Sequence, residues 1–319
     1  FLAFVISVTG ILLNGLLLYA VRRFSGVNMG TYKQLLTCFT ITDLFLVAMN
    51  VLMQPRVILV GWTHAIVTDT IIDDRRITSL FIALQSVPFT VIGIHFLYRY
   101  WSVRRPHLME LFSNKKFIIF LISLTIGFMV AWFLMSYYIP TGQEDSVARR
   151  SVIEAYEKKY GRRIENAWIV LDHWRDEKLD VSLLLGIVVI NIMMISSLVL
   201  ASILAIRTFY HIKHTAKLSV QFVRLQKKLL IALCAQAFVP SVFVCIPYVL
   251  TVNIPVFRIP VYFFHDITIP LFTCFPVWDA GLMTLLITDY RKGLIGLIWK
   301  NKVNVGWTTL AMTTTSATV

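Results

Sequence analysis

The 319-residue sequence has few charged side chains for its length. Asp, Glu, Lys and Arg make up 15% of the chain, whereas a soluble domain carries about 25%. Long apolar blocks separate the charges, and a soluble core does not need such blocks. The net charge of +13 does not indicate nucleic-acid binding, because that function needs a solvated basic face. The scarcity of charge therefore excludes an ordinary soluble fold and a nucleic-acid partner.

Cysteines are also scarce, and none lies in a polar loop. A disulfide framework is therefore not expected. We expect the four cysteines to act as small buried hydrophobic residues. They are Cys38, Cys234, Cys245 and Cys274.

Motifs for catalysis and metal binding are missing as well. The chain has no Gly-rich phosphate loop, no G-x-S-x-G elbow and no H-E-x-x-H motif. His211 and His214 lie in a basic loop without further ligands at zinc spacing, so we predict no metal site. We expect no cofactor and no enzymatic activity, and a membrane enzyme is a third alternative that nothing in the sequence favours.

The sequence does contain seven long apolar blocks. Apolar residues make up 57% of the chain, and the mean hydropathy is +0.73. A helix of about 20 apolar residues crosses the hydrocarbon core, and its backbone groups are satisfied internally. We predict an all-α membrane protein, a seven-transmembrane helix bundle over residues 1–292 with a short, disordered tail over 293–319. The expected spans are 1–21, 35–53, 80–98, 117–139, 181–206, 229–252 and 259–287.

The distribution of Lys and Arg predicts the orientation of this bundle. With the N-terminus outside, 18 of the 30 basic residues fall in the cytoplasmic segments, against only two acids, Glu110 and Asp289. The opposite side then carries as many acids as bases. Because cytoplasmic loops are enriched in Lys and Arg, we predict the N-terminus outside and the C-terminus in the cytoplasm. We expect a multi-pass protein of the plasma membrane whose basic side attracts anionic membrane lipid.

The longest predicted outer loop covers residues 141–180 and alternates in charge. Its apolar residues Ile164, Trp168, Leu171 and Trp174 recur near helical spacing. We expect short helices over the mouth of the bundle. Two roles stay open: a solvated loop with local helix, or a lid that shapes ligand access.

Polar side chains inside the spans are costly and are therefore functional candidates. Asn14 and Asp43 lie in the first two spans, where Asn14 could donate to Asp43 in a polar cluster that water or Na⁺ could join. Such a cluster is either structural or part of a switch. Other switch candidates are Asp279, Tyr290 and Arg291 at the end of the seventh span. Candidates for a ligand pocket are Gln85, Ser86, Asn191, His265 and Asp266, although each could equally be a structural hydrogen-bonding group or, for the last two, a helix cap.

The third span ends in an arginine flanked by aromatic residues. Arg99 is either an anchor at the membrane boundary or a residue facing the cavity that a G-protein helix enters.

Several motifs in a fixed order resemble those of a known family. They are Gly10-x-x-x-Asn14, the segment 96–101 with Pro106, the segment 226–236 with Pro240 and Pro247, and Asp279 followed by Asp289-Tyr290-Arg291. With the long second outer loop, they resemble the nematode seven-transmembrane G-protein-coupled chemoreceptors of the Str/Srj type. The resemblance implies a heterotrimeric G protein as partner, a location in sensory cilia, and roles for Arg99 and the Asn14–Asp43 pair in coupling.

Three departures from rhodopsin-like receptors accompany this resemblance. Tyr98 stands where an acidic residue usually precedes the arginine, Ala280 rather than proline follows Asp279, and the long outer loop lacks cysteine. They argue against a rhodopsin-style ionic lock and against the usual loop disulfide.

The leading hypothesis is a chemosensory receptor. It would bind a small molecule, an odorant or soluble cue, in the outer half of the bundle and activate a G protein. The alternative is a seven-helix ligand-gated channel or transporter. Transporters usually show internal repeats or paired charges at the membrane midplane, whereas this sequence has no repeat and few deep charges.

Overall fold

The computed structural model describes residues 2–25, 32–139, 146–175, 177–214, 220–259 and 264–297. The side chains of residues 221, 222, 225 and 264–266 lie outside this description.

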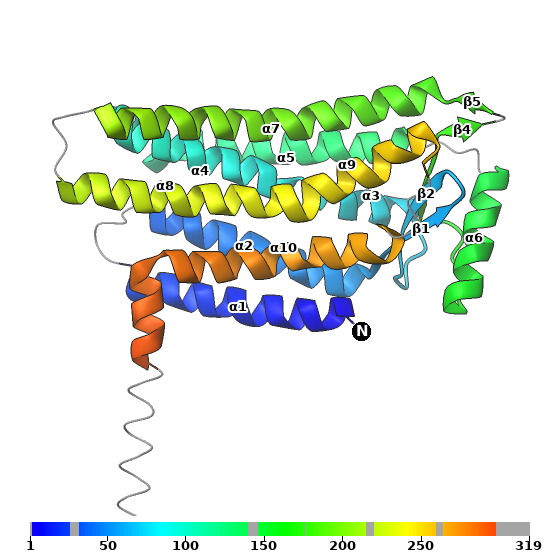
Figure 1. The fold of residues 1–319 in the computed structure, drawn as a ribbon, viewed down its shortest axis with the longest axis horizontal. Helices are drawn as coiled ribbons and strands as arrows, with labels where there is room; N and C mark the ends of the chain where they lie inside the picture. The colour runs from blue at the N-terminus through cyan, green and yellow to red at the C-terminus, as the bar shows by residue number, and fades with distance from the viewer. Residues whose placement is uncertain are drawn as a thin grey trace, which may run out of the picture.

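The seven predicted spans are confirmed. The described residues contain seven helical segments that are long and apolar enough to cross a membrane, and they lie side by side along the long axis of the molecule (Figure 1). The helices are α1 (Leu2–Phe24), α2 (Tyr32–Met53), α3 (Arg75–Leu84) with α4 (Val87–Arg104), α5 (Lys115–Tyr138), α7 (Val181–His214), α8 (Val220–Pro240) with α9 (Ile246–Asn253), and α10 (Phe264–Leu286).

Two spans are irregular at their centres. Between α3 and α4 the amides of Gln85 and Ser86 donate to carbonyls three residues back, and Pro88 follows, which lacks an N–H. Between α8 and α9 the π-helical segment η3 (Ser241–Cys245) precedes Pro247. Proline and π-helical turns are recognised causes of bends in helices. Both irregularities lie beside the cavity described below.

The helices extend beyond the predicted spans. The third span begins at Arg75 rather than at residue 80, and α7 continues to His214 rather than ending at 206. The hydrophobic pattern marks where lipid ends, whereas a helix can continue into water as long as its backbone hydrogen bonds persist.

A small β-sheet covers one end of the bundle. Strands β1 (Pro55–Val60) and β2 (Thr63–Thr68) form an antiparallel hairpin, and β3 (Trp168–Asp172) pairs with β2. The hairpin turn is Gly61-Trp62, where Gly61 has a φ of 58°, as two-residue hairpin turns require. The sheet lies at the same end as the N-terminus (Figure 1).

The long loop after α5 is partly helical and partly extended. Helix α6 (Val147–Tyr160) packs beside the sheet, and the short strands β4 (Trp174–Arg175) and β5 (Lys178–Leu179) pair with each other. The helical spacing predicted from Trp168, Leu171 and Trp174 is therefore wrong, because these residues lie on strands. Pairing of β3 with the distant β2 strand, and of β4 with β5, overrides the local pattern.

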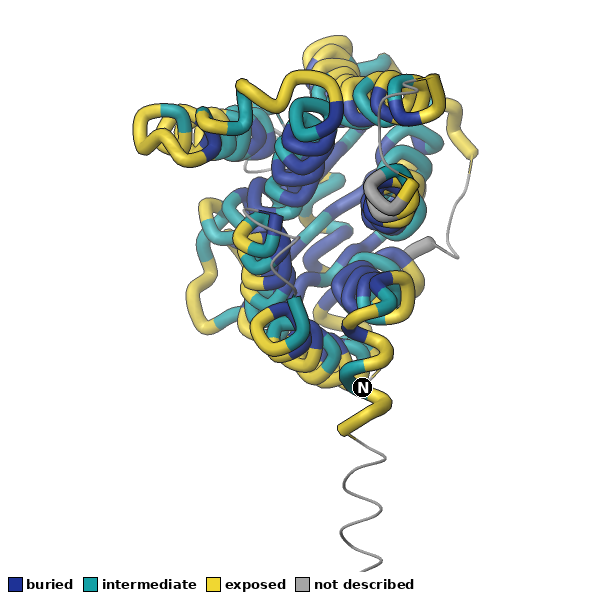
Figure 2. The backbone as a smooth tube through the Cα atoms, turned by 90° about the vertical axis from the view of Figure 1, so that its left-hand side faces the viewer, coloured by how far each residue is buried: buried dark blue, intermediate teal, exposed yellow. Residues whose placement is uncertain are grey.

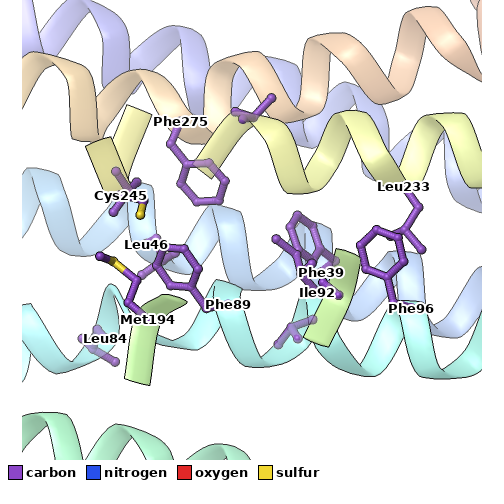
Figure 3. Packing of buried hydrophobic residues seen from close by; sticks show 14 of the residues in the cluster. Phe39, Leu46, Leu84, Phe89, Ile92, Phe96, Met194, Leu233, Cys245 and Phe275 are labelled. Atoms are coloured by element: carbon purple, nitrogen blue, oxygen red, sulfur yellow. The ribbon is translucent and has the colours of Figure 1, made fainter. Parts of the chain in front are cut away.

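The helices pack around an apolar core. Phe39 and Leu46 of α2, Phe89 and Ile92 of α4, and Phe275 of α10 belong to this core (Figure 3). Exposed residues lie mainly on the outer perimeter of the bundle, as the end-on view shows (Figure 2). In α5 only Leu121, Trp132 and Ser136 are buried, so most of this apolar helix faces lipid.

The cysteines form no disulfide, but their predicted burial is mostly wrong. Only Cys245 is buried, Cys274 is intermediate, and Cys38 and Cys234 are exposed. A thiol on the outside of a membrane bundle contacts lipid rather than water, so an apolar block does not distinguish an inner from an outer position.

The chain continues past α10 as a further helix over residues 288–297, which turns away from the bundle axis (Figure 1). This helix runs beyond residue 293, where the sequence places the start of the tail. Residues 298–319 of the predicted tail lie outside the described residues.

Candidate ligand cavity and signalling core

A cavity of about 80 Å³ lies beneath the sheet, inside one end of the bundle. All three strands of the sheet and the helices α3, α4, α5, α7, α9 and α10 contribute to its wall. The wall is mainly aromatic and aliphatic, with Phe81, Phe89, Trp132, Ile187, Met194 and Phe272 among its residues. One water molecule needs about 10–15 Å³ by the same type of measure. The cavity therefore has room for a small organic molecule.

Few polar groups in this wall are available to a ligand. The hydroxyl groups of Ser136 and Thr251 donate to carbonyls of their own helices, at 2.8 and 2.5 Å. Gln85 lines the cavity, and its buried Nε2 has no hydrogen-bond partner among the described residues. An unpartnered buried donor favours a ligand that brings one acceptor.

Of the predicted ligand residues whose side chains the structure describes, one lines this cavity. Gln85 is part of the wall, whereas Ser86 is buried and donates to the carbonyl of Ala83 at 2.7 Å. Asn191 donates to Oδ1 of Asn253 at 2.9 Å and does not line the cavity. The side chains of His265 and Asp266 lie outside the described residues.

Sequence reasoning missed the strand residues of the wall, including Val57 and His64. A signal for them exists, because two runs rich in Val, Ile and Thr flank the pair Gly61-Trp62. Such a pattern is typical of a β-hairpin.

Asn14 joins the first and seventh spans. Its Nδ2 donates to the carbonyls of Gly10 and Pro276 at 3.0 and 2.9 Å. The expected bond to Asp43 is not formed. A Cβ on Gly10 would lie 3.2 Å from Val47 and 3.3 Å from Val277, so the glycine allows the three helices to approach closely.

Two carboxyl groups lie together in the middle of the bundle. Asp43 and Asp279 are both fully buried, and their side chains interact with each other. Nε2 of Gln236 donates to Oδ2 of Asp279 at 3.2 Å. Because two buried carboxylates repel, a proton held by one of them lets the pair hydrogen-bond. The arrangement links α2, α8 and α10 by polar contacts in a lipid-surrounded bundle.

Arg99 lies inside the bundle rather than at its lipid-facing surface. The side chain is 3% exposed, and its Nη1 donates to Oε1 of Gln226 at 3.1 Å. The guanidinium carbon lies 3.7 Å from the centroid of the Tyr32 ring. A cation–π contact and an amide thus take the place of the acidic partner that Tyr98 displaces.

Tyr290 and Arg291 have opposite environments. Tyr290 is fully buried, and its hydroxyl forms a 2.8 Å hydrogen bond with the hydroxyl of Ser25. Burial raises the pKa of the Tyr290 phenol to about 12. Arg291 is exposed, with a 3.4 Å bond from Nη1 to the carbonyl of Leu285. Tyr290 therefore closes the end of the bundle, and Arg291 is available at its surface.

Among the described residues, no group of His, Cys, Asp and Glu could hold a metal ion. The cavity, the polar core and the buried arginine follow one another from the sheet-covered end of the bundle to the opposite end.

Comparison with known proteins agrees with this seven-helix architecture. Residues 1–295 match the family described as serpentine-type seven-transmembrane G-protein-coupled chemoreceptor Str. The chain is similar to the serpentine receptor class r-10 of Caenorhabditis elegans, at 21% identity over 310 residues, covering 94% of this chain and 91% of the relative. The Caenorhabditis briggsae receptor of the same name is 23% identical over 302 residues, covering 91% and 87%.

The match extends over all seven spans and includes the residues of the cavity, the carboxyl pair and the arginine. The family is a class of receptors and not of enzymes. The chain thus belongs to the Str family of nematode serpentine seven-transmembrane G-protein-coupled chemoreceptors.

Proposed function

We propose that this chemoreceptor binds a small, mainly apolar molecule in the cavity beneath the sheet. The observation that carries the proposal is the composition of the wall, in which apolar side chains from six helices and the sheet surround one unpartnered amide, that of Gln85. Binding sites for small molecules are typically apolar with a few placed polar groups. An odorant or soluble cue with one carbonyl or ether oxygen fits this composition.

The charge distribution supports access from outside the cell. The sheet-covered end contains the predicted outer loops, and the opposite end contains the predicted basic cytoplasmic loops. With this orientation, the ligand reaches the cavity from the extracellular side. We propose the plasma membrane of sensory cilia as the location of this receptor.

Ligand binding would be transmitted through the irregular sixth span. Val244 belongs to the π-helical segment and lines the cavity. Gln226 lies on the same span and holds Arg99 near the opposite end. A shift of α8 about this segment would withdraw Gln226 from Arg99 and open the cytoplasmic end. Ligand would act by favouring this second conformation.

A heterotrimeric G protein is the proposed partner at that end. The proposal places Arg99 in the opened cavity, with the basic residues of the second and third cytoplasmic loops beside it. The buried carboxyl pair, Asn14 and Tyr290 would hold the resting arrangement of the helices, and Arg291 would contribute to the basic docking surface.

A pair of neighbouring substitutions on α7 tests the cavity. Ile187 is 2% exposed and lines the cavity, whereas Val188 is 42% exposed and faces away from the core. Cells expressing the receptor are screened with short-chain alcohols, ketones and esters, using a second-messenger readout. Ile187→Trp should raise the half-maximal concentration of the active compound more than about tenfold, and Val188→Trp should leave it unchanged.

Surface expression of both variants is measured in parallel. Equal half-maximal concentrations for the two variants would contradict the proposal that this cavity is the ligand site. Ligand-evoked current in cells lacking G proteins would instead support the channel alternative.

A further inference from the structure

A second cavity, distinct from the proposed ligand cavity, opens between α1, α2, β1, α6 and α10. Its volume is about 410 Å³. Val57 and Ile269 line both cavities and form the partition between them. The remaining wall differs in character from the first cavity, because an arginine and several polar side chains take part in it.

The cation in this cavity has no acidic partner among the described residues. Arg56 packs its guanidinium carbon 4.9 Å from the centroid of the Tyr160 ring. Its buried Nε has no hydrogen-bond partner within the described part of the chain. Asp69 is bound instead to Arg162, with 2.5 Å between Nη1 and Oδ1. A guanidinium group without an acidic partner favours an anionic ligand.

Buried polar groups lie on the same wall. Asn50 is 6% exposed, and its Oδ1 has no hydrogen-bond partner among the described residues. Ser7 is 3% exposed and lines the cavity from α1. Buried polar atoms normally have partners, so the unused acceptor of Asn50 favours a bound water or a hydroxyl group of a ligand.

The rest of the wall is apolar and reaches the lipid-facing surface. Leu2 and Phe4 line the cavity and are 60% and 62% exposed. Val51 and Pro270 continue the apolar surface inward. The cavity thus combines one cation, a few polar groups and a route to the hydrocarbon.

We propose that this cavity is a second binding site, which takes a carboxylate-bearing amphiphile with a single apolar chain. Arg56 binds the carboxylate, a water held by Oδ1 of Asn50 beside Ser7 completes the polar end, and the chain lies along Val51 toward Leu2 and Phe4. Because Val57 and Ile269 belong to both walls, an occupant here also restrains the shape of the neighbouring cavity. The site goes beyond the proposed function, since it requires neither an odorant nor a G protein.

Photolabelling of the full chain tests the site. The purified receptor is placed in nanodiscs of phosphatidylcholine and labelled with a diazirine analogue of dodecanoic acid, with the matching dodecanol analogue as a neutral probe. Labelled peptides should map to residues 2–7 and 50–57, and unlabelled dodecanoate should displace the acid probe. The dodecanol probe should label about tenfold more weakly, because it lacks the charge that Arg56 binds.

Matched variants separate ligand binding from folding. Arg56→Gln should lower the affinity for the acid probe about tenfold, and Arg56→Lys should retain most of it because the charge remains. Val51→Phe fills the cavity without removing Arg56 and should block labelling. Arg76→Gln is the control, since Arg76 is an exposed arginine of α3 that does not line this cavity.

Equal labelling of the wild type and Arg56→Gln, or equal labelling by the two probes, would overturn the proposal. Displacement by phosphatidylglycerol but not by dodecanoate would assign the cavity to a membrane phospholipid and would also overturn it. Because the assay contains no odorant and no G protein, a negative result would leave the proposed chemoreceptor function untouched.

Discussion

The guanidinium carbon of Arg99 lies 3.7 Å from the centre of the Tyr32 ring, so an aromatic face on α2 holds the buried cation of α4. The amide oxygen of Gln226 on α8 is the second partner of this cation. A neutral ring and a neutral amide hold the arginine more weakly than a buried carboxylate would. We therefore expect the resting state of this receptor to depend on both contacts.

The Tyr32 contact gives the first prediction. Tyr32→Leu removes the ring, and a cation–π contact contributes about 0.5–2 kcal/mol. Ligand-independent G-protein activation should rise by about two- to thirtyfold. Tyr32→Phe keeps the ring and should behave as wild type. Nucleotide exchange on a purified G protein measures both, and equal basal exchange in Tyr32→Leu and Tyr32→Phe would contradict the role of the ring.

Arg99 itself gives a second prediction. Arg99→Ala should abolish ligand-stimulated nucleotide exchange while the protein still reaches the cell surface. The buried position of the arginine makes a stability control necessary, so surface expression is measured with the thermal midpoint of the purified protein. Unchanged ligand-stimulated exchange in this variant would refute the coupling role of the arginine.

Because Gln236 donates a hydrogen bond to Asp279, we expect two substitutions of Asp279 to change stability differently. Asp279→Ala leaves the buried Nε2 of Gln236 without its acceptor, a loss of about 1–3 kcal/mol of stability. Asp279→Asn keeps an oxygen for Gln236 and removes one carboxyl group from the pair with Asp43. We expect its thermal midpoint to equal or exceed that of the wild type. A midpoint for Asn no higher than that for Ala would contradict the role of the Gln236 hydrogen bond.

Because His173 is buried, we expect the stability of the protein to depend on pH. Its Nε2 is 2.9 Å from the carbonyl oxygen of Val252, and burial lowers its pKa from the usual 6.5. The unfolded chain therefore binds this proton at a higher pH than the folded protein does. Stability is full above pH 6.5 and falls as the pH drops below it.

Replacing this histidine tests the sign of the effect. His173→Gln should flatten the slope of thermal midpoint against pH just below 6.5, the usual pKa of histidine. His107→Gln, at an exposed histidine of the segment Pro106–Ser113, should leave the slope unchanged. Burial also raises the pKa of the neighbouring Asp172. Protonation of this carboxyl group therefore stabilises the folded protein as the pH falls toward the usual pKa of an aspartate, well below the range in which His173 titrates. A steep slope that persists in His173→Gln would locate the titrating group elsewhere.

The attachment of the sheet gives the last prediction. The amides of Glu165, Asn166 and Ala167 donate to the Asp73 carboxylate at 2.9, 2.8 and 2.6 Å. Asp73→Ala should lower the free energy of local opening by about 1–3 kcal/mol and speed amide exchange in β3. Asp74→Ala removes only the cap of α3, where Asp74 accepts from the amide of Arg76. Equal exchange in β3 for the two variants would contradict the role of Asp73.

The sequence by itself determined the seven spans and the identity of the costly polar residues. Whether a segment of about 20 residues prefers lipid depends on its own composition, so the spans need no knowledge of the fold. For the same reason Asn14, Asp43, Arg99 and Asp279 stand out as polar groups in apolar blocks. These features depend on transfer from water to hydrocarbon, which acts on each segment separately.

Only the tertiary structure decided which of these groups meet. Asn14 donates to the carbonyl of Pro276 instead of to Asp43, and Arg99 contacts Tyr32 and Gln226. The rotation and tilt of each helix decide these partners, and all seven spans fit a bilayer in many rotations. Strand β3 pairs with β2 far along the chain, and this pairing creates the roof of the ligand cavity. Contacts between distant segments depend on the packing of the whole bundle, which no local pattern encodes.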